Sequence, residues 1–233
     1  MPTILELINL STGYLEKKGI ESPRINSELL LADILSCKRL DLYLLFDKPV
    51  SEGEVNVYRN YISRRANNEP LQYILGKVDF YGTILSVDKS VLIPRQETEI
   101  LVEKTLEYIK NDFNSGEIKI LDIGTGSGNI SISLLRNCKD CTIDAVDVSD
   151  EAIAIAKKNA NENNVQDKIN FIKADFRELA KSDLKYNFIV SNPPYVACDE
   201  YLNLQKEILN FEPKEAVTDF KNGLSFYEDI SAF

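Results

Sequence analysis

The chain has 233 residues, of which 44% are hydrophobic and 27% charged, and this suits a globular protein with one large or two small domains. Its net charge is -10, whereas proteins that grip a phosphate backbone are usually basic, so extended nucleic-acid binding is disfavoured. The absence of histidine excludes a Ser-His triad, a histidine general base and a histidine-ligated metal, and we expect no metal site.

Nothing in the sequence predicts secretion or membrane contact. The first residues, Met-Pro-Thr-Ile-Leu-Glu, lack the basic stretch and apolar core of a signal peptide. No apolar run approaches the roughly 18 residues of a membrane span. Four cysteines are too few for a disulfide framework in a chain of this length, which favours a reducing compartment. We therefore expect a cytoplasmic protein, and we interpret Cys138 and Cys141 as incidental thiols rather than as a redox or zinc motif.

Residues 1–70 are predicted to form a small helical domain. Apolar residues recur at helical spacing between Ile4 and Leu15. Ser22-Pro23 is typical of an N-cap followed by proline in the first turn, and Ser51 with the acids after it begins another helix. Three arginines of this last helix are interpreted as a solvated face rather than as a patch that docks a partner: Arg59, Arg64 and Arg65.

The next segment, residues 71–92, is punctuated by glycine and rich in β-formers, which predicts a hairpin linking two domains. A second domain is expected over residues 93–233. It opens with a helix that begins near Arg95, has acids in its first turn and runs to about Asn111.

From residue 118 onward, strands and helices alternate, which is the pattern of a doubly wound parallel sheet in an α/β fold. The predicted strands are 118–123, 141–146, 169–172 and 186–190. The chain stops inside a predicted helix, so we expect the C-terminal strands of the domain to be missing. The fourth strand would then be an unpaired edge of the sheet.

A glycine loop, Gly124-Thr125-Gly126-Ser127-Gly128, follows the first strand and lets a ligand touch the backbone. Its spacing matches neither the dinucleotide pattern nor a P-loop, which leaves a nucleoside that need not offer a pyrophosphate. Asp147, at the end of the second strand, is placed to accept hydrogen bonds from both ribose hydroxyls. Asp175 and Phe176, at the end of the third strand, suit an adenine amino group and the face of the base.

The fourth strand leads into the turn Ser191-Asn192-Pro193-Pro194-Tyr195. Proline ends the strand, and Asn192 and Pro193 are held extended because a residue before proline avoids the helical region. The turn therefore aims the Asn192 amide, the Pro193 carbonyl and the Tyr195 ring at one space. The alternative interpretation is an ordinary strand end with a capping asparagine.

Together, the glycine loop, Asp147, Asp175-Phe176 and this turn resemble a class I S-adenosylmethionine-dependent methyltransferase with a Rossmann-like domain. Asn-Pro-Pro-Tyr is shared by enzymes that methylate planar amino or amide nitrogens in nucleic acid or in protein. The chain is similar in particular to the HemK/PrmC family of release factor glutamine methyltransferases. The segments that carry this resemblance are Arg24 with Glu28–Ala32, Pro70–Gly76, Phe80–Gly82, Ile93–Glu99 and Phe211–Pro213.

The resemblance implies that S-adenosylmethionine is the cofactor, bound by the glycine loop, Asp147, Asp175, Phe176 and Asn192. It implies that the substrate is the glutamine of the Gly-Gly-Gln motif in peptide chain release factors. The residues expected to contact this substrate are Asn192, Pro193, Pro194 and Tyr195.

In the implied mechanism, the Asn192 side-chain oxygen and the Pro193 carbonyl are the catalytic groups. They accept the two N–H groups of the substrate amide, while Tyr195 packs against its flat face. Residues 1–70 would recognise the substrate, and no direct nucleic-acid binding is expected. Two alternatives stay open, namely an amino methyltransferase of nucleic acid and an inactive cofactor-binding fragment.

Overall fold

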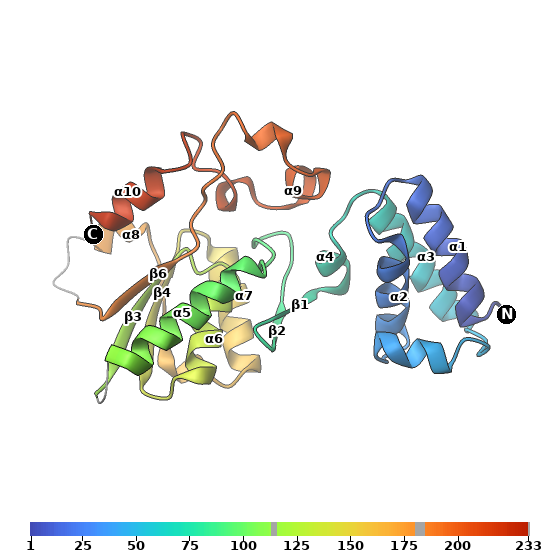
Figure 1. Cartoon of the computed structure of the whole chain (residues 1–233), viewed down its shortest axis with the longest axis horizontal. Coiled ribbons are helices and arrows are strands. Elements are labelled where there is room, and N and C mark those ends of the chain that lie inside the picture. The colour runs from blue at the N-terminus through green and yellow to red at the C-terminus, as the bar shows by residue number, and fades with distance from the viewer. Residues whose placement is uncertain (113–115, 180–184, 233) are drawn as a thin grey trace. The chain divides into compact units, whose positions relative to one another are not determined.

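The computed structural model describes residues 1–112, 116–179 and 185–232 (Figure 1). The chain divides into two units, Met1–Leu75 and Gly76–Phe233, and each is described by itself. The first is helical and the second contains a parallel β-sheet with helices, which confirms the expected α/β fold. No helix in the described parts of the chain combines the length and the apolar character needed to cross a bilayer.

Helices build the first unit. They are α1 (Ile4–Lys17), α2 (Pro23–Ile34), a 3-10 helix (Arg39–Leu44), α3 (Glu52–Ala66) and α4 (Leu71–Leu75). Capping boxes begin α1 and α3, where Thr3 pairs with Glu6 and Ser51 pairs with Glu54. The apolar faces of these helices meet in one core, which includes Ile4, Ile8, Leu15, Leu30, Leu31, Leu42 and Tyr58.

Glu28 on α2 is fully buried, although glutamate is rarely found inside a protein without a partner. Its carboxylate accepts hydrogen bonds from Arg24 Nε at 2.9 Å, Arg39 Nη1 at 2.8 Å and the Tyr43 hydroxyl at 2.9 Å. Arg39 and Tyr43 both belong to the 3-10 helix, so this cluster ties that helix to α2.

The three arginines of α3 differ in exposure. Arg59 is exposed and Arg64 forms an ion pair with Glu69 at 2.6 Å. Arg65 is only 4% exposed, and its Nε donates to Asn26 Oδ1 at 2.7 Å. The interpretation of all three as a solvated face is therefore wrong for Arg65. A guanidinium can be buried where polar groups accept from its donors, as Asn26 does here.

The second unit begins with an antiparallel hairpin of β1 (Lys77–Phe80) and β2 (Thr83–Ser86). The main sheet consists of β3 (Ile118–Ile123), β4 (Cys141–Asp147), β5 (Ile169–Lys173) and β6 (Phe188–Ser191). Its neighbouring strands are parallel, and their order is β5-β4-β3-β6. The chain moves outward from β3 to β5 and then returns to the other side of β3. Open α/β sheets bind ligands at such a switch point.

Helices connect and flank the strands of this unit. Before β6 they are α5 (Glu97–Asp112), α6 (Asn129–Asn137), α7 (Asp150–Glu162), a 3-10 helix (Gln166–Lys168) and α8 (Phe176–Leu179). After β6 they are 3-10 helices at Tyr201–Asn203 and Lys214–Ala216, α9 (Lys206–Phe211) and α10 (Ser225–Ser231). Among the described residues β6 pairs with β3 alone, so it lies at an edge of the sheet, as expected.

The strands contribute to two separate apolar cores. The larger joins Ile120 and Ala145 of the sheet to Val102 of α5 and Ile132 of α6. The smaller contains Leu121, Ile123, Val146 and Phe176, with Phe226 and Ile230 of α10 packed against them. The helix nearest the end of the chain therefore packs against residues of the sheet.

Cys138 and Cys141 form a disulfide between the end of α6 and the start of β4. The interpretation of this pair as incidental thiols is therefore wrong. The chain turns directly from helix to strand, which places the two Cα atoms 5.7 Å apart, within bonding range for a disulfide. Cys37 and Cys198 are free.

We expect Glu28→Gln to destabilise the first unit by about 1–3 kcal/mol, because it weakens two charged hydrogen bonds of a buried carboxylate. The partly exposed arginines can be rehydrated, which keeps the loss below that of a fully buried pair. Urea unfolding followed by circular dichroism measures the change. The exposed Glu16→Gln is the control, and equal midpoints for the two variants would contradict the prediction.

Candidate active site

The glycine loop between β3 and α6 turns back onto β4. The backbone N–H groups of Gly124 and Thr125 both donate to Val146 O, at 2.9 and 3.0 Å. Gly128 is the N-cap of α6 with φ +79°, and a Cβ there would lie 3.3 Å from Ala156 Cβ on α7. Glycine suits this position because it adopts the left-handed conformation without strain and leaves room for α7.

Two side chains hold this loop from neighbouring elements. Asp147 at the end of β4 accepts from Gly126 N through Oδ2 at 2.9 Å and from Ser149 N through Oδ1 at 3.0 Å. Asn159 on α7 is fully buried and donates to Ser127 O at 2.8 Å. Each oxygen of the Asp147 carboxylate can accept a second hydrogen bond, so the group can still bind hydroxyls of a ligand.

A cavity of about 340 Å³ lies beside this loop at the carboxyl edge of the sheet, a volume within the usual range for a small-molecule site. The predicted site residues in its wall are Gly124, Thr125, Gly126, Ser127, Asp147, Phe176, Asn192, Pro193 and Pro194. The Ser127 hydroxyl is buried and has no hydrogen-bond partner within the described residues. A ligand with polar groups would satisfy it, because buried polar atoms usually have a partner.

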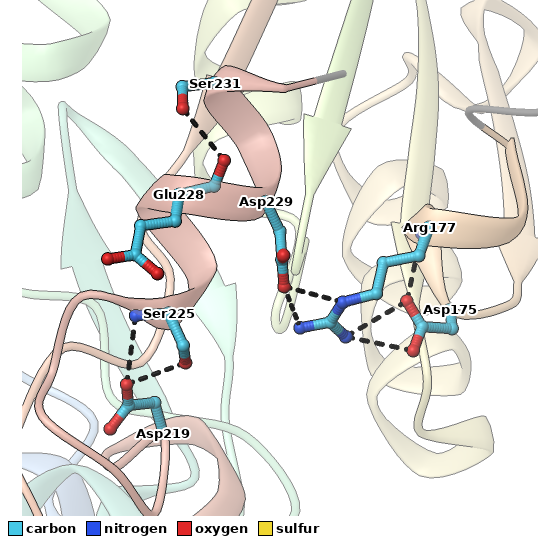
Figure 2. Close-up of polar contacts among 7 residues, drawn as sticks. All are labelled: Asp175, Arg177, Asp219, Ser225, Glu228, Asp229 and Ser231. Carbon is cyan, nitrogen blue, oxygen red and sulfur yellow. Dashed lines mark hydrogen bonds and ion pairs between the residues drawn. The ribbon is translucent and has the colours of Figure 1, made fainter.

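Two of the predicted cofactor residues, Gly128 and Asp175, are not part of the cavity wall. Gly128 caps α6, and Asp175 Oδ2 forms an ion pair with Arg177 Nη1 at 3.1 Å. Figure 2 shows Arg177 held between Asp175 and Asp229 of α10, whose Oδ2 lies 2.6 Å from Arg177 Nη2. The structure therefore brings Asp175 together with α10.

Phe226 on α10 lines the cavity together with Phe176. Their ring centroids lie 6.3 Å apart, and the Arg177 guanidinium lies 5.1 Å from the Phe176 centroid and 5.2 Å from that of Phe226. Phenyl rings offer a flat ligand an apolar surface for stacking. Phe226 could not be predicted from the sequence because its helix contains no motif, and only the fold brings it close to Phe176.

Asp219 holds the turn that leads into α10. Its carboxylate accepts from the backbone N–H groups of Lys221, Gly223 and Ser225 and from the Ser225 hydroxyl, part of which Figure 2 shows. Loss of solvent raises the pKa of Asp219, but these hydrogen bonds outweigh that effect and lower it to about 2. Gly223 lies so close to Tyr195 that an added Cβ would be 2.5 Å from Tyr195 O. This segment therefore packs directly against the Asn-Pro-Pro-Tyr turn.

Asn192 also lines a second cavity of about 180 Å³. This one lies between the start of α5 and the turn after β6, and its wall is formed by Arg95, Glu97, Thr98, Leu101, Asn192 and Tyr195. Pro193 and Pro194 thus border the first cavity, Tyr195 borders the second, and Asn192 borders both. Of the four residues predicted from the turn to contact the substrate, Asn192 and Tyr195 border this second cavity, whereas Pro193 and Pro194 do not.

Asp122 on β3 is fully buried beneath the glycine loop. Its Oδ2 accepts from the Thr125 hydroxyl at 2.8 Å and from the Ser131 hydroxyl at 2.6 Å. Burial raises the pKa of Asp122 to about 6 and the charge of Asp147 acts in the same direction, while the two hydroxyl hydrogen bonds oppose them. Asp122 thus anchors the loop, at the cost of holding a carboxylate away from water.

A parallel sheet with a glycine loop at its switch point and a strand-end carboxylate beside a cavity are typical of Rossmann-like folds that bind nucleosides, and the methyltransferases are one class of them. Two family models match the chain, the PrmC N-terminal domain over residues 6–76 and the methyltransferase small domain over residues 97–215. The chain is 41% identical over 216 residues to the release factor glutamine methyltransferase of Leptospira interrogans, covering 92% of this chain and 75% of that protein. It therefore belongs to the release factor glutamine methyltransferase family, as the sequence motifs predict.

A second relative supports this assignment, and one solved structure shares the fold. The release factor glutamine methyltransferase of Fusobacterium nucleatum is 38% identical over 228 residues, covering 97% of this chain and 63% of that protein. The chain thus spans less than two thirds of that relative. Among solved structures, the hMettl16 catalytic domain in complex with a MAT2A 3'UTR hairpin superposes with a TM-score of 0.51 at 21% identity. That alignment covers 80% of this chain and 74% of the other, and it shows a shared fold.

The family uses S-adenosylmethionine as its cofactor, and the first cavity fits that molecule. The Asp147 carboxylate offers acceptors for ribose hydroxyls, and Phe176 and Phe226 offer a surface for a base. The unpartnered Ser127 hydroxyl can bind a polar group of the ligand.

We expect Asp122→Asn to change how stability depends on pH. The pKa of Asp122 is raised in the folded state, so its contribution to stability is greatest at low pH and is lost as pH rises through about 4 to 6. The free energy of unfolding of the variant should therefore rise, relative to that of the wild type, by about 2 kcal/mol between pH 4 and pH 7.5. Urea titrations across this range measure it. A difference between Asp122→Asn and the wild type that does not change with pH would refute the prediction.

We also expect Phe226→Ala to weaken binding of S-adenosylhomocysteine about fivefold, because one of the two rings is removed from the cavity wall. Isothermal titration calorimetry measures the Kd. The neighbouring Tyr227 lies on the same helix but outside the cavity wall, so Tyr227→Ala is the matched control and should bind as the wild type does. An unchanged Kd for Phe226→Ala would show that the ring does not contact the ligand.

Proposed function

We propose that this chain transfers the methyl group of S-adenosylmethionine to the side-chain amide nitrogen of the glutamine in the Gly-Gly-Gln motif of peptide chain release factors. The observation that carries the proposal is the position of Asn192 in the walls of both cavities. A methyl donor in the first cavity and a flat amide in the second would meet at this residue.

Asn192 and Pro193 supply the polar contacts of the proposed reaction. An amide nitrogen is a poor nucleophile because its lone pair is delocalised into the carbonyl. The Asn192 side-chain oxygen and the Pro193 carbonyl would accept its two N–H groups and hold the nitrogen in line with the methyl group. The bound cofactor supplies an electrophilic methyl group on a sulfonium.

Tyr195 would pack on the flat face of the substrate amide at the border of the second cavity. The nitrogen needs no base before transfer, because its proton becomes acidic once the nitrogen is alkylated. A chain without histidine is therefore chemically sufficient for this reaction. Orientation by Asn192, Pro193 and Tyr195 supplies most of the rate in this proposal.

Two observations favour a release factor over nucleic acid as the substrate. The relatives at 38% and 41% identity both bear the name release factor glutamine methyltransferase. The net charge of -10 opposes binding along a phosphate backbone. We assign substrate recognition to residues 1–70, a linking role to residues 71–92 and methyl transfer to residues 93–233. We place the reaction in the cytoplasm, where translation ends.

We expect Asn192→Ala to lower the rate of methyl transfer at least about 100-fold, because it removes an acceptor that orients the substrate amide. The assay follows labelled methyl from S-adenosylmethionine to a purified release factor. Binding of S-adenosylhomocysteine should weaken only a few fold, since the rest of the first cavity is intact. The exposed Asn203→Ala is the control and should transfer methyl at the wild-type rate.

Near wild-type transfer by Asn192→Ala would contradict the assigned role. A release factor whose loop glutamine is changed to alanine should accept no label. Label on this altered protein, or on RNA or DNA, would instead favour a different acceptor.

A further inference from the structure

We propose that Thr98 is a positioning residue, which fixes the orientation of the Asn192 amide and so makes the second cavity select an amide over a carboxylate. This inference rests on the proposed function, because it concerns the glutamine that Asn192 would contact.

An asparagine side chain ends in an oxygen and a nitrogen. They are almost identical in shape, but one is a hydrogen-bond acceptor and the other a donor. If Oδ1 of Asn192 points toward the substrate, it accepts from the N–H of a glutamine. If Nδ2 points there instead, it faces the N–H donors of a glutamine. The site would then prefer a substrate carboxylate, which accepts hydrogen bonds. The orientation of one side chain therefore decides which acceptor the site favours.

The contact that sets this orientation comes from α5. Asn192 Nδ2 donates to Thr98 Oγ1 at 3.3 Å, across 94 residues of sequence. Thr98 is 7% exposed, so water competes little for its hydroxyl. With Nδ2 engaged in this way, Oδ1 is left as the end that can accept from a substrate. Both residues line the second cavity, which is where the acceptor amide would lie.

The position of Thr98 is itself held by the start of α5. Its backbone N–H donates to Arg95 O at 3.0 Å. Arg95 Nη2 lies 2.6 Å from Glu212 Oε1, and the side chain of Glu212 is 1% exposed. This buried carboxylate anchors Arg95, which lies just before α5, to the residue that follows α9. These contacts hold the backbone of Thr98 in place, so its hydroxyl stays within hydrogen-bonding distance of Asn192.

The Thr98 hydroxyl could also donate, but in the structure it accepts from Asn192 Nδ2, and the predicted selectivity depends on this direction of the hydrogen bond. With Thr98 accepting, as in the structure, the site binds an amide. Without that acceptor, Asn192 is free to turn and to donate to a carboxylate. A residue that merely supported the fold would not change this preference, because loosening the site weakens both ligands alike.

The test compares Thr98→Val, which keeps the shape but removes the hydroxyl, with Thr98→Ser, which keeps the hydroxyl. Each variant is titrated with a release factor carrying its loop glutamine and with one carrying glutamate at that position. We expect Thr98→Val to reduce the preference for glutamine about tenfold, as the loss of one hydrogen bond allows. Thr98→Ser should keep that preference within about twofold. The Kd of S-adenosylhomocysteine should be unchanged in both, since Thr98 is not in the first cavity.

The inference is overturned if Thr98→Val keeps the wild-type preference, or if Thr98→Val and Thr98→Ser lose it equally. Should Thr98→Val fold poorly by circular dichroism, Thr98→Ala compared with Thr98→Ser gives the same contrast. Methyl transfer by the wild type is measured alongside. Its absence would refute the proposed function, whereas the binding preference tests Thr98 separately.

Discussion

The hydrogen bond from the Gly126 backbone N–H to Asp147 Oδ2 joins the two loops on which the cofactor site depends. It fixes the glycine loop after β3 to the end of β4, while the other oxygen of Asp147 fixes the start of α7 through Ser149. Asp122 holds the same loop from below through Thr125. Carboxylates on two adjacent strands thus position the glycine loop, Asp147 through the Gly126 backbone N–H and Asp122 through the Thr125 hydroxyl.

The parallel sheet makes these local contacts into one site. Because β3 is the switch point, the loops after β3, β4 and β6 open at the same edge. The segment that follows β6 then packs back against it, with Val196 N donating to Val217 O at 3.1 Å and Gly223 against Tyr195. The Asn-Pro-Pro-Tyr turn is therefore held on one side by a strand and on the other by residues more than 20 positions later in the sequence.

Features that depend on a few adjacent residues could be predicted from the sequence. The glycine loop, the strand ends and the proline turn are of this kind, because glycine and proline restrict the backbone wherever they occur. Contacts between residues that meet only through tertiary packing could not be predicted from the sequence. Arg177 bridges Asp175 to Asp229, and Phe226 joins Phe176, only because α10 packs on the sheet. The burial of Arg65 is of the same kind, since the composition of α3 does not show which arginine contacts Asn26.

Asn192 forms part of the wall of both cavities, and this has a thermodynamic consequence. Two ligands that contact the same side chain do not bind independently, because a ligand in one cavity changes the charge distribution and hydrogen-bonding capacity that this side chain offers in the other. The effect is reciprocal, so each ligand changes the affinity for the other by the same factor. With a cofactor in the first cavity and a substrate amide in the second, as proposed, one asparagine is enough to give the two sites heterotropic cooperativity without any movement of a domain.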